Sequence, residues 1–114
     1  MDLKVNVEHV AKAAVVHIEG EVDLYSSKKV REEIMRLTNA RTRIIVIDLA
    51  SVKYMDSSGV ATLIEGLQQS RKYDGRFSLA ALQPNVREVF ELTRLDRVFE
   101  IHIDWKSALE NPTP

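Results

Sequence analysis

A short segment near the middle of the chain, residues 53–60, gathers side chains that can take part in chemistry. It reads Lys-Tyr-Met-Asp-Ser-Ser-Gly-Val and brings together a carboxylate (Asp56), two hydroxyls (Ser57 and Ser58) and a glycine (Gly59). The simplest interpretation is helix capping, because a carboxylate or hydroxyl from Asp56 or Ser57 would accept a hydrogen bond from a free backbone N–H. Gly59 would then lie in the first helical turn.

The same segment also fits a phosphorylated serine. A helix N-terminus presents free N–H groups and the positive end of the helix dipole, so it can accommodate a phosphate. Phosphorylation adds about −1.5 to −2 charges at neutral pH. Such a charge costs an exposed loop little, but it disrupts an interface with an acidic or apolar surface. The residues alone leave both interpretations open.

A second polar cluster, at residues 20–26, contains Asp23 and Ser26. By itself it fits a turn followed by a helix cap, with either side chain supplying the capping oxygen. The carboxyl ends of parallel strands meet at one edge of a sheet. If the strands that precede the two clusters are parallel, Asp23 lies near Ser57. It would then help to present Ser57 to a kinase and would lie close to the phosphate once added.

Hydrophobic spacing predicts the elements that position these clusters. Strands are expected near residues 3–8, 15–18, 44–49, 77–82 and 99–103, and helices over 26–37, 57–73, from Pro84 onward and over 105–109. Gly20 is expected to end the second strand, and Gly75 to end the second helix in a left-handed conformation. The run at 44–49 is apolar without alternation, which is typical of a strand covered on both faces.

Strands that alternate with helices indicate an α/β fold. We expect a single domain with a mixed, mostly parallel sheet, an N-terminal hairpin and about four helices. It would span residues 1–110, with a frayed tail at 111–114. The two aromatic residues Tyr54 and Trp105 are expected in the core.

Composition narrows the possible functions. The chain has 114 residues with 16 Lys plus Arg against 17 Asp plus Glu, a formal net charge of −1. This balance gives no electrostatic case for direct binding to nucleic acid or to an anionic membrane. No unbroken apolar run is longer than four residues, the length of the run at 44–47, and this is far shorter than the roughly 20 residues that span a bilayer. With no signal-peptide core at the N-terminus, we expect a cytoplasmic protein with no membrane insertion.

The sequence offers few parts for an enzyme. There is no cysteine, and the three histidines form no metal-ligand pattern, so no cofactor is expected. A serine hydrolase needs a positioned base, but His17 and His102 share predicted strands with apolar neighbours and are expected to be strand or core residues. A phospho-accepting receiver domain has a similar layer order. It requires an acidic pair after the first parallel strand, but the chain has no Asp-Asp pair, and Asp48 lies inside a predicted buried strand.

The two polar clusters and their separation resemble the STAS domain, and more closely the bacterial anti-sigma factor antagonists. The resemblance is carried by Gly-Glu-Val-Asp at residues 20–23, Tyr-Met-Asp-Ser-Ser-Gly at 54–59 and Leu-Thr-Arg-Leu at 92–95. It covers nearly the whole chain.

The resemblance implies a non-enzymatic binding module. Such antagonists sequester an anti-sigma factor that is also a serine kinase, so that a sigma factor is released. The kinase uses ATP and Mg²⁺ to phosphorylate the serine directly after the Asp, the modified antagonist dissociates, and a PP2C-type phosphatase resets it. By position, Ser57 is the implied phosphorylation site. Asp23, Asp56, Ser58 and Gly59 are the implied partner-binding residues, with Gly59 allowing close approach of the kinase.

One departure and one alternative accompany this resemblance. Many members follow the motif with Leu-Gly, where this chain has Val60 and Ala61. A methyl group on a partner-facing surface alters which kinase fits. This departure therefore bears on which partner the chain binds. The alternative is a non-switching STAS subunit that docks on a transporter ATPase or on a stress-signalling scaffold.

Overall fold

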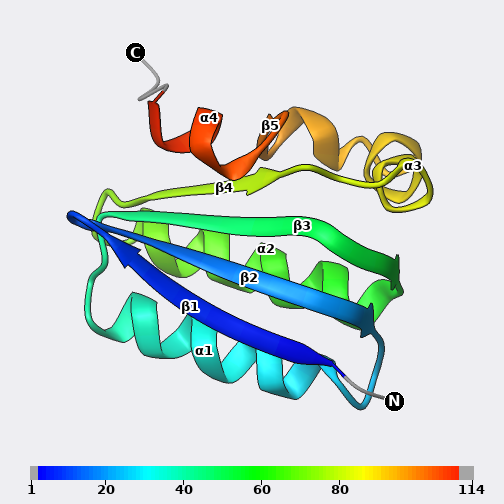
Figure 1. Cartoon of the computed structure of the whole chain (residues 1–114), viewed down its shortest axis with the longest axis horizontal. Coiled ribbons are helices and arrows are strands. Elements are labelled where there is room, and N and C mark those ends of the chain that lie inside the picture. Colours follow the sequence, from blue (N-terminus) through cyan, green and yellow to red (C-terminus); the bar gives the residue numbers. More distant parts are fainter. Residues whose placement is uncertain (1–2, 111–114) are drawn as a thin grey trace.

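Five strands form one sheet whose order in space follows their order along the chain (Figure 1). The computed structural model describes residues 3–110. The strands are β1 (Lys4–Val10), β2 (Ala13–Val22), β3 (Ile44–Met55), β4 (Arg76–Ala80) and β5 (Glu100–His102). The helices are α1 (Ser27–Asn39), α2 (Ser57–Arg71), α3 (Pro84–Leu92), the 3₁₀ turn η1 (Leu95–Arg97) and α4 (Trp105–Glu110).

The sheet is mixed, as the sequence predicts. β1 and β2 form an antiparallel hairpin that turns at Ala11, which has a positive φ of 56°. Every later neighbouring pair, from β2·β3 to β4·β5, is parallel. The expected α/β fold with a hairpin and four helices is therefore confirmed. The expected tail at 111–114 lies outside the described residues.

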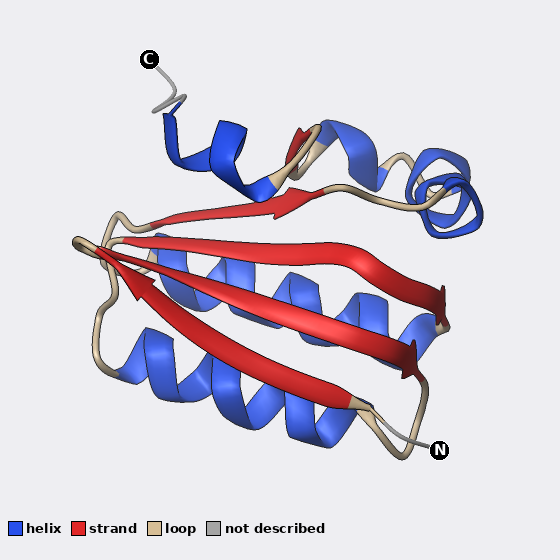
Figure 2. Ribbon diagram, in the orientation of Figure 1, coloured by secondary structure: helices blue, strands red, loops and turns tan. Residues whose placement is uncertain are grey.

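The helices cover the two faces of the sheet unequally. α1 and α2 lie side by side along one face (Figure 2). There Val30, Ile34 and Leu63 pack against the strands in the main core, to which α3 adds Phe90. The short helix α4 contributes Ala108 to a smaller cluster with Val15, Val46 and Ala80. None of the described helices is long and apolar enough to cross a membrane.

Two strands run further than predicted, and this extension forms the edge of the sheet where the two polar clusters lie. β2 continues past Gly20 to Val22, because Gly20 adopts a φ of 120° and the β2·β3 register shifts on both sides of it. Glycine accepts this conformation without strain, so the strand bulges instead of ending. β3 continues from Leu49 to Met55 and pairs with the extended part of β2.

Two other expectations need correction, the end of α2 and the burial of Tyr54, whereas Trp105 does pack against the core. α2 ends at Arg71, and the left-handed residue after it is Asp74, with a φ of 61°, instead of Gly75. A Cβ on Gly75 would lie 2.5 Å from the ring of Tyr73, so crowding explains this glycine. Tyr54 is 46% exposed and is not a core residue. Trp105 is half-buried and packs against the smaller cluster.

Candidate functional site

Two strand-to-helix junctions meet at one edge of the sheet. β2 and β3 are parallel and reach that edge together, with Val22 paired to Met55. The Asp56 N–H donates to the Val22 carbonyl at 3.1 Å, which ties the start of α2 to the end of β2. The polar clusters that begin at Asp23 and at Asp56 therefore come together, as a parallel arrangement requires.

Asp56 caps α2. Its Oδ1 accepts hydrogen bonds from the Ser58 N–H at 2.9 Å, the Gly59 N–H at 3.4 Å and the Ser58 hydroxyl at 2.6 Å. The Ser58 hydroxyl contributes most to holding the pKa of Asp56 below its usual value, and the nearby charge of Asp23 opposes this shift. The capping interpretation is thus confirmed with Asp56, not Ser57, as the acceptor.

The two adjacent serines occupy different environments. Ser57 is the first residue of α2 and is exposed, and within residues 3–110 its hydroxyl has no hydrogen-bond partner. Ser58 is half-buried, and its hydroxyl is committed to the Asp56 carboxylate. Of the two, only Ser57 offers a hydroxyl that is both accessible and unengaged.

The Asp23 junction is held by a network of its own. Asp23 Oδ1 accepts from the Tyr25 N–H at 3.0 Å and the Ser26 N–H at 2.9 Å, and the Ser26 hydroxyl donates to the Glu21 carbonyl at 2.8 Å. The backbone hydrogen bond from Ser26 is the largest cause of the lowered pKa of Asp23. Neither Asp23 nor Ser26 caps α1 with its side chain, contrary to expectation. Both instead stiffen the loop.

This stiffened loop presents two apolar side chains to solvent. Leu24 is 65% exposed and Tyr25 is 86% exposed. Exposed apolar residues that gather at one place often mark an interaction surface. Sequence reasoning did not single out these two residues, although two large apolar residues within an otherwise polar turn were a signal that could have found them.

Gly59 has a packing role. It is buried, and a Cβ at this position would lie 2.6 Å from Met55 Cγ and 2.8 Å from Val22 Cγ1. The absence of a side chain lets the first turn of α2 pack closely on the ends of β2 and β3. This is a structural reason for the glycine that the sequence did not reveal, and its expected role in partner binding stays a prediction.

A shallow apolar hollow of about 340 Å³ borders Ser57. Its lining includes Ser57, Val60, Ala61, Ile64, Val89 and Thr93. α2 and α3 both contribute, so the hollow arises from tertiary packing and could not be read from either helix alone. Ala61, the residue that departs from the family pattern, is exposed in this hollow.

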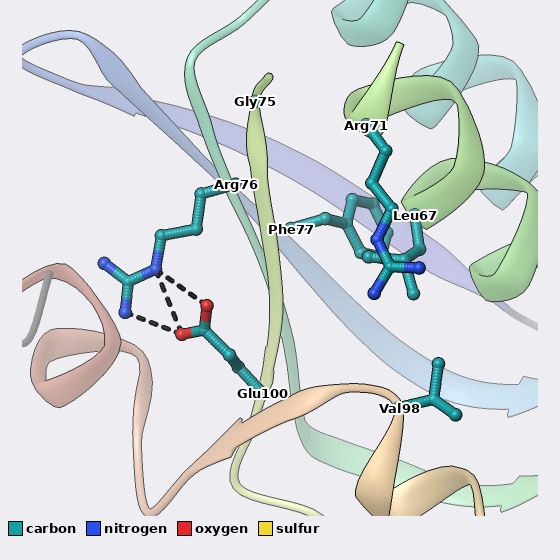
Figure 3. A pocket seen from close by; sticks show the side chains of 7 residues that line it. All are labelled: Leu67, Arg71, Gly75, Arg76, Phe77, Val98 and Glu100. Carbon is teal, nitrogen blue, oxygen red and sulfur yellow. Dashed lines mark hydrogen bonds and ion pairs between the residues drawn. The ribbon is translucent and has the colours of Figure 1, made fainter. Parts of the chain in front are cut away.

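A second hollow, also of about 340 Å³, lies where α2 ends and β4 begins (Figure 3). Arg71 and Arg76 both line it, and the Arg76 guanidinium is paired with the Glu100 carboxylate at 2.7 Å. Arg71 is fourteen residues after Ser57 in α2, about 21 Å along the helix axis at 1.5 Å per residue. This hollow is therefore separate from the junctions.

His17 is engaged in the sheet, as the sequence predicts. Its Nδ1 lies 2.7 Å from Asp48 Oδ2 and its Nε2 lies 2.9 Å from Glu8 Oε1. Burial lowers the pKa of His17, but the hydrogen bonds to Asp48 and Glu8 outweigh that effect and raise it above 6.5. With both ring nitrogens occupied, His17 is not available as a base for Ser57. Across residues 3–110 no cluster of His, Asp and Glu is arranged to hold a metal ion.

Comparison with known proteins gives a consistent result. The family model described as the STAS domain matches residues 4–108. The anti-sigma-B factor antagonist of Bacillus subtilis is 28% identical and covers 89% of this chain and 92% of its own. An anti-sigma factor antagonist from Mycobacterium paratuberculosis is 27% identical, with a TM-score of 0.88 over 96% of this chain and 92% of its own.

A more distant structure shares the fold. The Bacillus cell fate determinant SpoIIAA in its phosphorylated form is 21% identical, with a TM-score of 0.77 over 96% of this chain and 100% of its own.

Proposed function

The chain belongs to the STAS domain family, and we propose that it is an anti-sigma factor antagonist whose binding is switched by phosphorylation of Ser57. The relatives that carry this name cover most of the chain, and antagonists of this family are binding modules, not enzymes. The observation that carries the proposal is the exposed, unengaged hydroxyl of Ser57 at the start of α2, beside a Ser58 hydroxyl that is already committed.

The geometry supports a switch that acts on the interface and not on the fold. Asp56 already occupies the Ser58 and Gly59 N–H groups that a helix N-terminus would offer to a phosphate. A phosphate on Ser57 would therefore remain at the surface, next to the negative charges of Asp56 and Asp23. The modification adds about −1.5 to −2 charges and would concentrate negative charge where a partner must approach.

The apolar surfaces that flank Ser57 support a protein partner. Leu24 and Tyr25 are exposed in the loop that follows Asp23, and the apolar hollow that includes Ala61 borders Ser57. Interfaces place apolar contacts at their centre and are sensitive to an unpaired charge there. In this account Asp23, Asp56 and the residues around them lie within the interface, and the Ala61 methyl helps to select which partner fits.

The proposed partner is an anti-sigma factor with serine kinase activity. In the forward step the Ser57 oxygen attacks the γ-phosphorus of ATP bound with Mg²⁺ in the kinase, the bond to ADP breaks, and the serine proton is released. A PP2C-type phosphatase hydrolyses the phosphoserine and restores the hydroxyl. Because sigma factors act on RNA polymerase, the proposal includes a cytoplasmic location.

Binding titrations test the proposal. Ser57→Ala should bind the anti-sigma factor as tightly as the wild type, but ATP should no longer release it. Ser57→Asp should bind at least about tenfold more weakly, a difference of about 1.4 kcal/mol. Ser58→Ala is the matched control and should still be released by ATP. Unchanged affinity of Ser57→Asp, together with release of Ser57→Ala by ATP, would overturn the mechanism.

A further inference from the structure

One edge of the sheet is unpaired along its full length. β1 is the first strand in the sheet order and pairs with β2 alone among the described strands (Figure 1). Its seven residues contain no glycine or proline, and their register with β2 has no shift. A regular strand of this kind presents a row of free N–H and C=O groups that can pair with another strand.

We propose that β1 pairs with β1 of a second copy of this chain, antiparallel and centred on Asn6, so that two five-stranded sheets join into one. In an antiparallel pair, opposed residues lie on the same face of the sheet. A two-fold axis at Asn6 places Lys4 opposite Glu8 of the second copy, and Val5 opposite Val7 of the second copy. The symmetry produces each of these pairs twice.

Charge selects this register. Lys4 and Glu8 are both exposed and lie on one face of β1, because their positions differ by an even number. Centring the pair on Val7 would oppose Lys4 to Val10, and centring it on Val5 would oppose Lys4 to Asn6. Neither shift pairs opposite charges. An edge lysine usually discourages strand pairing, but in the Asn6 register it meets a carboxylate.

The remaining contacts are compatible with this pairing. One oxygen of Glu8, Oε1, is bonded to His17, which leaves Oε2 for Lys4 of the second copy. Val5 and Val7 are half-buried at the margin of the main core, and the two copies would cover each other's valines. β2 lies between β1 and β3, so the strand that leads to Ser57 is not at this edge.

The interface is small, because a single strand edge buries much less than a standard protein–protein interface. We therefore expect a weak dimer with a Kd of roughly 0.1–1 mM. Sedimentation velocity over a concentration series that spans this range measures it directly. The wild type should shift from monomer to dimer as concentration rises.

Charge reversal tests the register. Lys4→Glu and Glu8→Lys each place like charges opposite one another and should weaken dimerisation at least about tenfold. An equimolar mixture of the two variants pairs every reversed charge with its opposite, and the double variant does the same within one chain. Both should restore a Kd within about threefold of the wild type. Lys12→Glu and Glu91→Lys, which change net charge equally at exposed positions outside β1, should dimerise like the wild type.

Clear outcomes overturn the proposal. A wild type that stays monomeric at every concentration excludes the dimer, and a dimer that tolerates Lys4→Glu excludes this edge and register. Glu8→Lys also breaks the contact with His17, so its folding is checked by circular dichroism. If the Glu8→Lys variant does not fold, the dimerisation of the Lys4→Glu variant alone tests the proposal.

Discussion

The two strand-to-helix junctions share one hydrogen-bond pattern but differ in what that pattern builds. In each, an aspartate directly after a strand accepts hydrogen bonds from amides two and three residues further on. Asp56 uses these bonds to start a helix and leaves the Ser57 hydroxyl outward. Asp23 uses them to shape a loop that leaves Leu24 and Tyr25 outward. One junction therefore carries the proposed switch, and the other carries apolar contact surface.

Within each junction, residues that hold the backbone alternate with residues that face solvent. Asp56 and Gly59 hold α2 against the strands, while Ser57 between them contacts solvent. Substitutions should accordingly fall into two classes, those that change stability and those that change binding.

Gly59→Ala should cause the largest loss of stability. The new Cβ would collide with the side chains of Met55 and Val22, and overpacking of this kind lowers the free energy of unfolding by about 1–3 kcal/mol. Urea unfolding measures the change. Ser57→Ala, two residues away in the same turn, is the control and should stay within about 0.5 kcal/mol of the wild type. Equal stability of both variants would remove the packing role assigned to Gly59.

Tyr25→Ala should affect binding without affecting the fold. Its side chain is 86% exposed, so the free energy of unfolding should change by less than about 0.5 kcal/mol. Affinity for the anti-sigma factor should fall about tenfold, or about 1.4 kcal/mol, because exposed tyrosines often supply much of an interface's energy. Ile103→Ala, at a position 80% exposed and outside both junctions, is the control. If the Tyr25→Ala and Ile103→Ala variants bind equally well, the Asp23 junction is not contact surface.

The two aspartates should differ in their effect on stability. Asp56→Ala removes the cap of α2 and should lower the free energy of unfolding by about 1 kcal/mol. Asp23→Ala loosens a loop and removes no helix cap, so its cost should be less than half as large. Urea unfolding of the two variants in parallel measures both. A greater cost for Asp23→Ala would reverse the roles assigned to the two junctions.

The pH dependence of stability should separate the contribution of His17, which lies in the sheet, from the contributions of Asp23 and Asp56 at the junctions. The pKa of His17 is raised, so its stabilising contribution is complete below 6.5 and is lost as pH rises through the folded-state pKa. The pKa values of Asp23 and Asp56 are lowered, so their contributions are present above 3.8 and are lost as pH falls through the folded-state values.

We expect a small decrease in stability of the wild type between about pH 6 and pH 9. His17→Gln should reduce that decrease, whereas His9→Gln, at an exposed position on β1, should retain it. Thermal unfolding at a series of pH values measures both. The same slope in all three proteins would mean that the Asp48 and Glu8 contacts do not stabilise the charged form of His17.

Much of the fold and part of the site could be predicted from the local sequence. Apolar spacing predicts the five strands and the four α-helices but not the 3₁₀ turn η1, and the Asp-Ser-Ser-Gly pattern predicts the cap that Asp56 makes. The extension of β2 through Gly20 was missed, because a bulge depends on pairing with β3 as well as on the glycine itself. The exposure of Tyr54 was missed for a related reason, since it lies in the part of β3 beyond the last residue paired with β4.

The meeting of the Asp23 and Asp56 clusters was predicted from the sequence, but two other features built from separate segments were not. The hollow beside Ser57 forms where α2 meets α3, and its lining residues Ile64 and Val89 are 25 residues apart along the chain. The crowding at Gly59 comes from Met55, at the end of β3, and from Val22, which lies at the end of β2 and is distant along the chain. Such contacts depend on the crossover geometry, which no local pattern encodes.

Identification of the phosphorylated residue tests the central claim most directly. The protein would be incubated with ATP, Mg²⁺ and an anti-sigma factor kinase that binds it, and then analysed by intact mass and site mapping. The account predicts one phosphate, on Ser57, that is absent in Ser57→Ala and retained in Ser58→Ala. A phosphate on Ser58 would contradict it, and so would a stable complex without phosphate, which would instead favour a constitutive docking subunit.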